Sequence, residues 1–215
     1  ILLVTKRTRK RKRTRPISYG MDILAHTLWA NAGARGANAL AKNLPAGRQG
    51  KIKFHVSVSW TAFWGVFPDL FAFTIPFAQR FYYLLFGITS FSSFFERPPR
   101  VEGEGLQNGF NISHILYQYS HSLVILLVVF LVVWVIYKRP RYELLGWALH
   151  ILIDIPSHTL AFYPTPFLFP ISDYKFPYGL QWSHQWFMLT NYGALLLVWG
   201  KIFIGNLFTK KANEI

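Results

Sequence analysis

The feature that most limits how this chain can fold is an apolar stretch of bilayer length at residues 115–137. Its core, SLVILLVVFLVVWVIY, contains no charged residue. A helix needs about 20 apolar residues to cross the hydrocarbon layer of a membrane, so the stretch predicts a transmembrane helix. Three more apolar stretches, each with a single charged residue, lie at 54–78, 144–163 and 186–208. A fifth, at 21–41, carries Asp22, His26 and Arg35 and predicts an amphipathic, re-entrant or tightly packed helix.

The composition excludes several classes of protein. The net charge is +14, yet the chain is 52% hydrophobic and only 15% charged. A soluble nucleic-acid-binding protein normally carries about a quarter charged residues, and a disordered basic protein would lack the 8 Trp and 20 Phe found here. We therefore expect no specific nucleic-acid partner. The sequence has no Cys, so any metal must be held by His, Asp or Glu.

Much of the positive charge lies in the first 20 residues, which contain eight basic residues and no acid. Like charges at this density disfavour folding, so residues 1–20 predict a disordered tail. Two explanations remain open. The segment could lie upstream of the true start at Met21, or it could be an arm that binds anionic lipid or nucleic acid.

The remaining charges alternate between the connections of a four-span arrangement. Connections 42–53 and 138–141 and the C-terminus are basic, whereas 79–113 and 164–185 are balanced. Basic connections stay in the cytoplasm, so this pattern predicts a multi-pass protein with both termini cytoplasmic. A soluble all-α protein would have no reason to alternate in this way. We predict an all-α, polytopic membrane helix bundle of four to five apolar helices at residues 21–208, with a short cytoplasmic tail at 209–215.

A few ionisable residues lie inside these apolar stretches. The strongest pattern is His150-x3-Asp154-x3-His158, because residues four apart share one helix face about 6 Å apart along the axis. Polar groups at this depth normally face a protein interior or a wet cavity and mark a functional site. Imidazole and carboxylate are ligands of zinc, manganese and iron, so this pattern predicts a divalent metal site, with zinc as the first choice.

Three other residues, His26, Asp69 and His121, lie in or beside the other apolar stretches. Each has a simpler explanation. An isolated intramembrane His often bonds a neighbouring helix, and Asp69 after Pro68 could cap a helix. His55, His114 and His184 flank connections and predict interfacial polar residues. Because so many buried polar groups would be costly unless they met, we favour one shared metal site.

The order of short motifs adds a resemblance to a known family. In sequence they are Met21-Asp22-x3-His26, Pro68-Asp69, His121-Ser122, His150-x3-Asp154 and a Pro-rich stretch that ends at Pro166. The chain resembles the YdjM-type family of LexA-regulated, inner-membrane-associated metal-dependent hydrolases over residues 21–197. It is more distantly similar to zinc-dependent phospholipase C enzymes. The resemblance implies an inner-membrane location and these metal-site positions: His26, Asp69, His121, His150 and Asp154. His158 is added from the helical spacing alone.

Two positions depart from the family pattern. The family has Pro-Asp-x-Asp, but Phe71 replaces the second acid here, which leaves open one metal or two, or an inactive site. An Arg common before the His-Ser pair is replaced by Tyr117-Gln118-Tyr119.

The leading functional hypothesis is a membrane-embedded metal-dependent hydrolase that acts on a phosphoester or lipid-like substrate. Asp69 or Asp154 would bind the metal or accept a proton from water. One alternative is a small transporter or proton/metal conduit that uses the same His and Asp residues, although four or five spans without a repeat are few. Another is a membrane adaptor with a basic arm. The sequence does not predict an oligomeric state.

Overall fold

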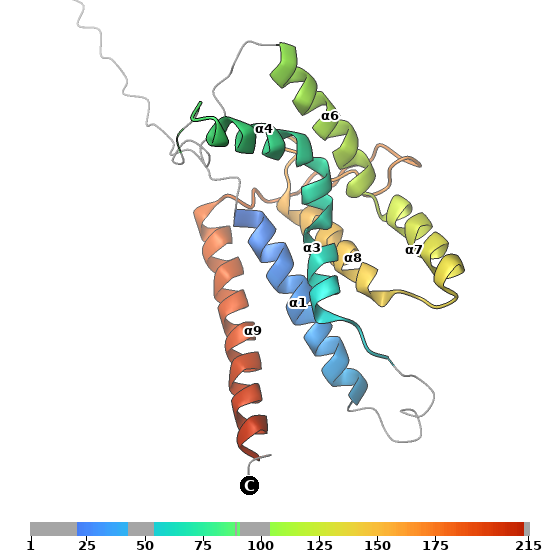
Figure 1. Ribbon diagram of the computed structural model, residues 1–215, viewed down its shortest axis with the longest axis vertical. Coiled ribbons are helices and arrows are strands. Elements are labelled where there is room, and N and C mark those ends of the chain that lie inside the picture. Colours follow the sequence, from blue (N-terminus) through green and yellow to red (C-terminus); the bar gives the residue numbers. More distant parts are fainter. Residues whose placement is uncertain (1–20, 43–53, 89, 91–103, 213–215) are drawn as a thin grey trace, which may run out of the picture.

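A computed structural model describes residues 21–42, 54–88, 90 and 104–212 of the chain (Figure 1). The predicted tail at 1–20, most of the predicted loop at 42–53 and the last three residues lie outside these ranges. Within them the chain is all-helical, as predicted. The elements are α1 (Met21–Lys42), α3 (Val58–Ala72), α4 (Thr74–Leu85), α6 (Glu104–Ser120), α7 (Leu123–Tyr137), the 3₁₀ turn η1 (Tyr142–Leu144), α8 (Leu145–Ser157) and α9 (Gln185–Ala212).

Helices α1, α3 and α8 form the centre of the molecule, and small residues let their backbones approach closely. A Cβ added to Gly65 of α3 would lie 2.4 Å from the Cβ of Ala30 in α1. A Cβ added to Gly146 of α8 would lie 2.1 Å from the carbonyl oxygen of Thr61 in α3. Small residues at such contacts are typical of helix packing in membranes, where close backbone approach stabilises the pair. These two glycines therefore fix how the three helices sit against one another.

Helix α9 runs beside α1 in the same direction. The indole nitrogen of Trp29 donates to the side-chain oxygen of Asn191 at 2.9 Å, and the guanidinium of Arg35 lies 5.6 Å from the ring centre of Trp199. The later residue of α1 contacts the later residue of α9, so the two helices are parallel. Residues Gln185–Gly205 of α9 are long and apolar enough to cross a membrane, which supports the span predicted at 186–208.

Two other predicted spans are broken by sharp bends. Helices α3 and α4 meet at 78° around Phe73, and residues 111–120 of α6 meet α7 at 61°. At the second bend the Ser122 hydroxyl caps α7 by accepting from the backbone N–H groups of Val124 and Ile125. The described residues thus contain one clear apolar span, or up to three if each bent pair counts as one. The predicted four to five spans are not confirmed.

Two further boundaries differ from the prediction. The apolar stretch at 144–163 is helical only over α8, whose 13 residues extend about 20 Å and end before a Pro-rich segment. The predicted connection at 79–113 contains the second half of α4 and most of α6. Both differences arise because apolar composition marks burial or lipid contact but does not say where a helix stops.

Candidate metal centre

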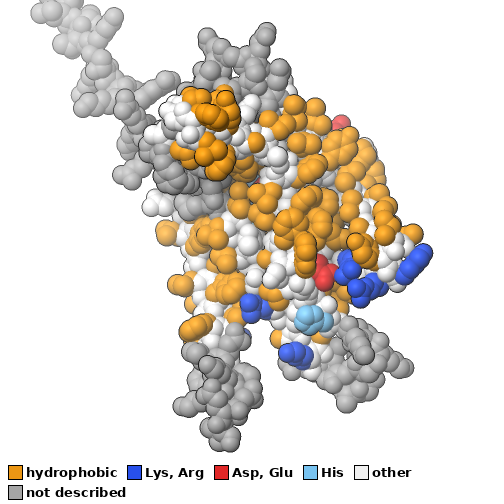
Figure 2. Space-filling model, viewed as in Figure 1, with side chains coloured by type: hydrophobic (Ala, Val, Ile, Leu, Met, Phe, Trp, Pro, Cys, Tyr) orange, Lys and Arg blue, Asp and Glu red, His pale blue; other side chains and the backbone are white. Residues whose placement is uncertain are grey.

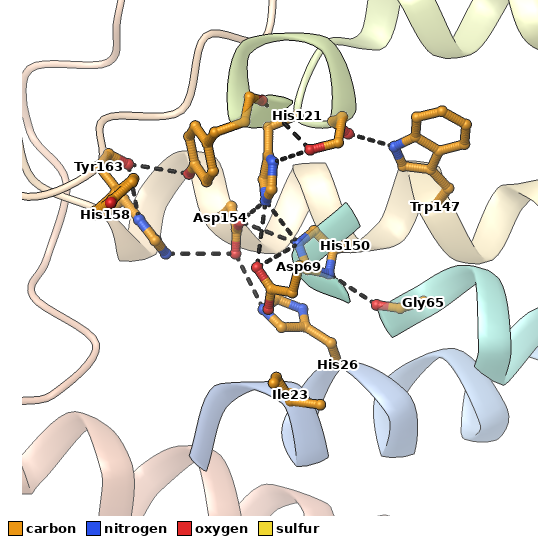
Figure 3. A network of polar contacts seen from close by, with 12 residues as sticks. Ile23, His26, Gly65, Asp69, His121, Trp147, His150, Asp154, His158 and Tyr163 are labelled. Carbon is orange, nitrogen blue, oxygen red and sulfur yellow. Dashed lines mark hydrogen bonds and ion pairs between the residues drawn. The ribbon is translucent and has the colours of Figure 1, made fainter. Parts of the chain in front are cut away.

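Six polar side chains from separate parts of the chain converge in the middle of the bundle (Figure 3). Four of them expose at most 2% of their surface. His158 exposes 9%, and the Asp69 side chain exposes 13%. The group, called the His/Asp centre below, consists of His26 from α1, Asp69 from α3, His121 between α6 and α7, His150 and Asp154 from α8, and His158 at the end of α8.

Asp154 lies at the middle of the His/Asp centre. Its Oδ1 is 3.1 Å from Nε2 of His26 and 3.7 Å from Nε2 of His158. Its Oδ2 is 3.3 Å from Nε2 of both His121 and His150. One buried carboxylate therefore faces four imidazole rings, which come from three parts of the fold.

Asp69 supplies the second carboxylate. Its Oδ1 lies 3.5 Å from Nε2 of His121 and 3.7 Å from Nε2 of His150. Two overlapping sets of three, His26/His150/Asp154 and Asp69/His121/His150, have ligand atoms within 4.8 Å of one another. Either set could hold a metal ion, and His150 belongs to both.

Hydrogen bonds to backbone carbonyls orient two of the imidazole rings. Nδ1 of His150 lies 2.8 Å from the carbonyl oxygen of Gly65, and Nδ1 of His158 lies 2.9 Å from that of Tyr163. A carbonyl only accepts, so each Nδ1 must carry the hydrogen, and in a neutral ring the lone pair is then on Nε2. Donation from the far ring nitrogen to a carbonyl is the usual arrangement of a metal-binding His.

The ring of His121 places its Nε2 atom against the Nε2 atom of His150. Nε2 of His121 lies 3.1 Å from Nε2 of His150, and Nδ1 of His121 lies 2.9 Å from the hydroxyl of Ser120. If both rings carry their hydrogens on Nδ1, the two Nε2 lone pairs face each other without a hydrogen. A cation near both nitrogens and the adjacent carboxylates would remove this repulsion. The nitrogen and carboxylate donors suit zinc, manganese or iron.

Tyr117 supports the centre from α6. Its ring stacks on His121 with centroids 3.7 Å apart, and its hydroxyl donates to the Tyr163 carbonyl at 3.0 Å. That carbonyl also accepts from His158, so it joins two sides of the centre. Tyr163 adopts a positive φ of 45°, which is uncommon for a residue other than glycine and turns the chain sharply here. Neither tyrosine was predicted from the sequence to have a role, although Tyr117 is four residues before His121 and thus on the same helix face.

The structure brings together all six residues predicted for the metal site, but two details differ. Pro68 and Asp69 lie inside α3, so the alternative in which Asp69 caps a helix start is wrong. His158 is not part of the helical stripe, because α8 ends at Ser157 and His158 has an extended backbone. Its ring still reaches Asp154. The roles of all six residues as metal ligands stay predictions.

The other histidines of the sequence analysis lie outside both sets of three. His114 is exposed and stacks its ring on Tyr163 with centroids 4.6 Å apart. His184 is exposed just before α9, and His55 precedes α3. This arrangement separates the buried histidines of the centre from three more accessible ones.

The all-helical fold, the apolar span of α9 and the buried His/Asp centre together define a helical membrane protein with a polar core that could bind metal. Residues 21–211 match the family model described as YdjM inner membrane protein. The chain belongs to this family, as its motifs predicted. No curated protein and no solved structure matches the chain.

Proposed function

We propose that the chain is a membrane-embedded metal-dependent hydrolase that acts on a phosphoester carried by an amphiphilic molecule. The observation that carries the proposal is the convergence of four imidazole Nε2 atoms and two carboxylates in a buried site between apolar helices. Such a concentration of polar groups is costly away from water unless it binds an ion. The ligand positions implied by the family resemblance are the same residues, apart from His158.

A bound divalent cation, zinc in the first instance, would supply Lewis-acid activation of water and of the bond to be cleaved. His26, His150 and Asp154 would hold it through Nε2, Nε2 and a carboxylate oxygen, and Asp69 with His121 would complete or extend the site. The surrounding apolar helices would exclude bulk water from it.

The two carboxylates differ in a way that suggests different roles. Asp154 is 1% exposed and contacts four rings, so it would hold the ligands in place. Asp69 is the more accessible, at 13%, and contacts two rings at longer distances. We therefore assign Asp69 as the group whose Oδ1 accepts a proton from the attacking water.

This proposal includes an inner-membrane, multi-pass location, with lipid as the surroundings and as the source of substrate. The conduit alternative predicts ion flux through the same residues without hydrolysis. No described contact favours it, since the six residues gather in one compact cluster instead of forming an extended row (Figure 3).

The test compares Asp154→Asn with Asp69→Asn in protein purified from membranes. Metal content is measured by elemental analysis. Hydrolysis is measured with bis(4-nitrophenyl) phosphate and with phosphatidylglycerol vesicles. We expect Asp154→Asn to lose both metal and activity. Asp69→Asn should retain most of the metal and lose activity by about 10²–10⁴-fold, the usual range for a general base.

Asp173→Asn, an exposed acid in the segment before α9, is the matched control and should behave as the unaltered protein. Metal-free protein from native membranes, or metal-loaded protein without hydrolysis of either phosphoester, would contradict the proposal. Flux of protons or metal into proteoliposomes that depends on Asp154, with no hydrolysis, would support the conduit instead.

A further inference from the structure

The end of α1 that points away from the His/Asp centre is basic, and three chain segments meet there. The Asn38 side chain in α1 bonds the backbone of Val56 in both directions, each at 2.9 Å. The backbone N–H of Ser57 lies 3.3 Å from the carboxylate of Glu143, and the rings of Phe54 and Tyr142 are 5.1 Å apart. The last turns of α1, the start of α3 and the turn between α7 and α8 are therefore neighbours.

Basic side chains gather at this end, which is called the basic end below. On the face shown in Figure 2 the Lys and Arg side chains lie towards the lower edge, while apolar side chains cover much of the rest. The parallel packing of α1 and α9 adds the C-terminal half of α9 to the same end. The basic residues described there are Lys42, Lys138, Arg139, Arg141 and Lys201. Under the positive-inside rule this end faces the cytoplasm.

The His/Asp centre lies well away from the basic end. His26 is 16 residues before Lys42 in one continuous helix, a rise of about 24 Å. Asp154 follows Arg141 by 13 residues, or about 20 Å if helical throughout. The hydrocarbon layer is about 30 Å thick. With the basic end at the cytoplasmic surface, the centre lies in the half of the membrane nearer the opposite surface.

Helix α4 marks that opposite surface. It leaves α3 at 78° just after Asp69 and exposes large apolar side chains, which suits a helix lying in the interface rather than crossing the membrane. Aromatic side chains are enriched at this depth. Its exposed residues include Phe81 (55%), Tyr82 (53%) and Leu85 (67%).

We infer that the His/Asp centre works at the membrane face opposite the cytoplasm, on a phosphoester head group presented from that leaflet. The substrate rests on the proposed hydrolase function, but the orientation does not. Asp69, the most accessible carboxylate of the centre, is three residues before the end of α3 and so lies beside the turn into α4. A head group at that interface reaches the centre without crossing the hydrocarbon layer.

The positive-inside rule also supplies a competing orientation. Residues 1–20 carry eight basic residues and precede α1 at its end near the centre. If they decided the topology, the centre would face the cytoplasm. The orientation inferred above instead places the start of α1 at the face opposite the cytoplasm, so it departs from the predicted cytoplasmic location of both termini. A direct measurement on the full chain separates the two orientations.

The first test uses the absence of Cys from the sequence, which gives single-Cys variants one labelling position. Asp173→Cys lies in the exposed segment tied to the start of α7 through the Leu123 N–H to Phe167 carbonyl bond. Arg139→Cys lies in the basic turn. A membrane-impermeant maleimide should label Asp173→Cys in intact cells, and Arg139→Cys only after the membrane is permeabilised. The reverse pattern, or equal labelling of both in intact cells, would overturn the inferred orientation.

The second test adds bis(4-nitrophenyl) phosphate, which is charged and stays outside, to right-side-out and inverted membrane vesicles. Hydrolysis is expected in right-side-out vesicles and at least about tenfold less in inverted ones. Equal or reversed rates would overturn the inference. If the labelling is as expected but neither vesicle hydrolyses this probe or phosphatidylglycerol, the orientation stands and the proposed function fails.

Discussion

The central helices α1, α3 and α8 differ from α9 in how tightly they pack. A Cβ added to Gly65 or Gly146 would overlap a neighbouring helix, whereas one added to Gly193 or Gly200 of α9 would meet nothing within 4 Å. The one described helix that is long and apolar enough by itself to cross a membrane is thus loosely packed at these glycines, and the close packing is found where the His and Asp side chains are held. Length and apolarity together single out α9, although it contributes no residue to the centre.

The largest expected effect comes from removing a histidine shared by both sets of three ligands. His150→Ala should weaken zinc binding by at least about 100-fold, beyond the effect typical of second-shell changes. The matched change near α9, His184→Ala, removes an exposed ring and should leave zinc affinity unchanged. Competition titration with a zinc chelator measures both. Equal affinities in the two variants would contradict the assigned centre.

The packing difference predicts a contrast between two Gly→Ala changes. Gly146→Ala would press its methyl against the Thr61 carbonyl of α3 and should destabilise the protein by about 1–3 kcal/mol. Gly193→Ala has open space and should be neutral, or stabilising by about 0.5–1 kcal/mol through the better helix propensity of Ala. Thermal unfolding in detergent checks the pair. A lower melting temperature for Gly193→Ala than for Gly146→Ala would reverse the comparison.

A smaller effect is expected at the edge of the centre. Tyr117→Phe keeps the ring that stacks on His121 but removes the hydroxyl that donates to the Tyr163 carbonyl, a hydrogen bond worth about 0.5–1.5 kcal/mol. We expect zinc affinity to fall several-fold while the fold is kept. Tyr119→Phe, on the exposed side of α6, is the control and should not change the affinity. No difference between them would show that the Tyr117 hydroxyl is not needed to hold the Tyr163 carbonyl in place beside His158.

The smallest effect is expected between α1 and α9. Asn191→Ala removes the acceptor of the Trp29 indole and should cost about 0.6 kcal/mol, the average for hydrogen bonds between membrane helices. Zinc affinity should stay the same, because α9 contributes no residue to the centre. A clear loss of zinc in this variant would mean that α9 positions His26 through α1.

The helical class was predicted correctly from the sequence, and α9 is long and apolar enough for the span predicted at 186–208. The sequence did not predict the bends at Phe73 and His121. The second bend depends on bonds to a distant segment, including those of the Ser122 hydroxyl with the Phe169 carbonyl and the Leu123 N–H with the Phe167 carbonyl. Periodicity within a window carries no information about such partners.

The residues of the centre were predictable for two different reasons. His150 and Asp154 follow from helical spacing, whereas His26, Asp69 and His121 needed the order of motifs along the chain. The groups that orient the rings were not predictable, since the carbonyls of Gly65 and Tyr163 belong to the backbone, which every residue has.

The departure at Phe71 has a simple structural context. Residues two apart in a helix are rotated by about 200° about the helix axis, so their side chains point in nearly opposite directions. Phe71 and Asp69 therefore lie on different faces of α3. Phe71 is 39% exposed and its ring is 5.6 Å from that of Phe67. The replacement of an acid here leaves both carboxylates of the His/Asp centre in place.

The order of the six side chains along the chain has a consequence for biosynthesis. His26 and Asp69 are made early, but Asp154 and His158 follow Asp69 only after roughly 90 further residues, which takes about 4–18 s at ordinary rates of translation. During that interval the first two lack their later partners in the nascent protein. Both candidate sets of three ligands need His150, so metal capture by either set would follow the synthesis of α8. Loading of the site would thus report that the whole core has assembled.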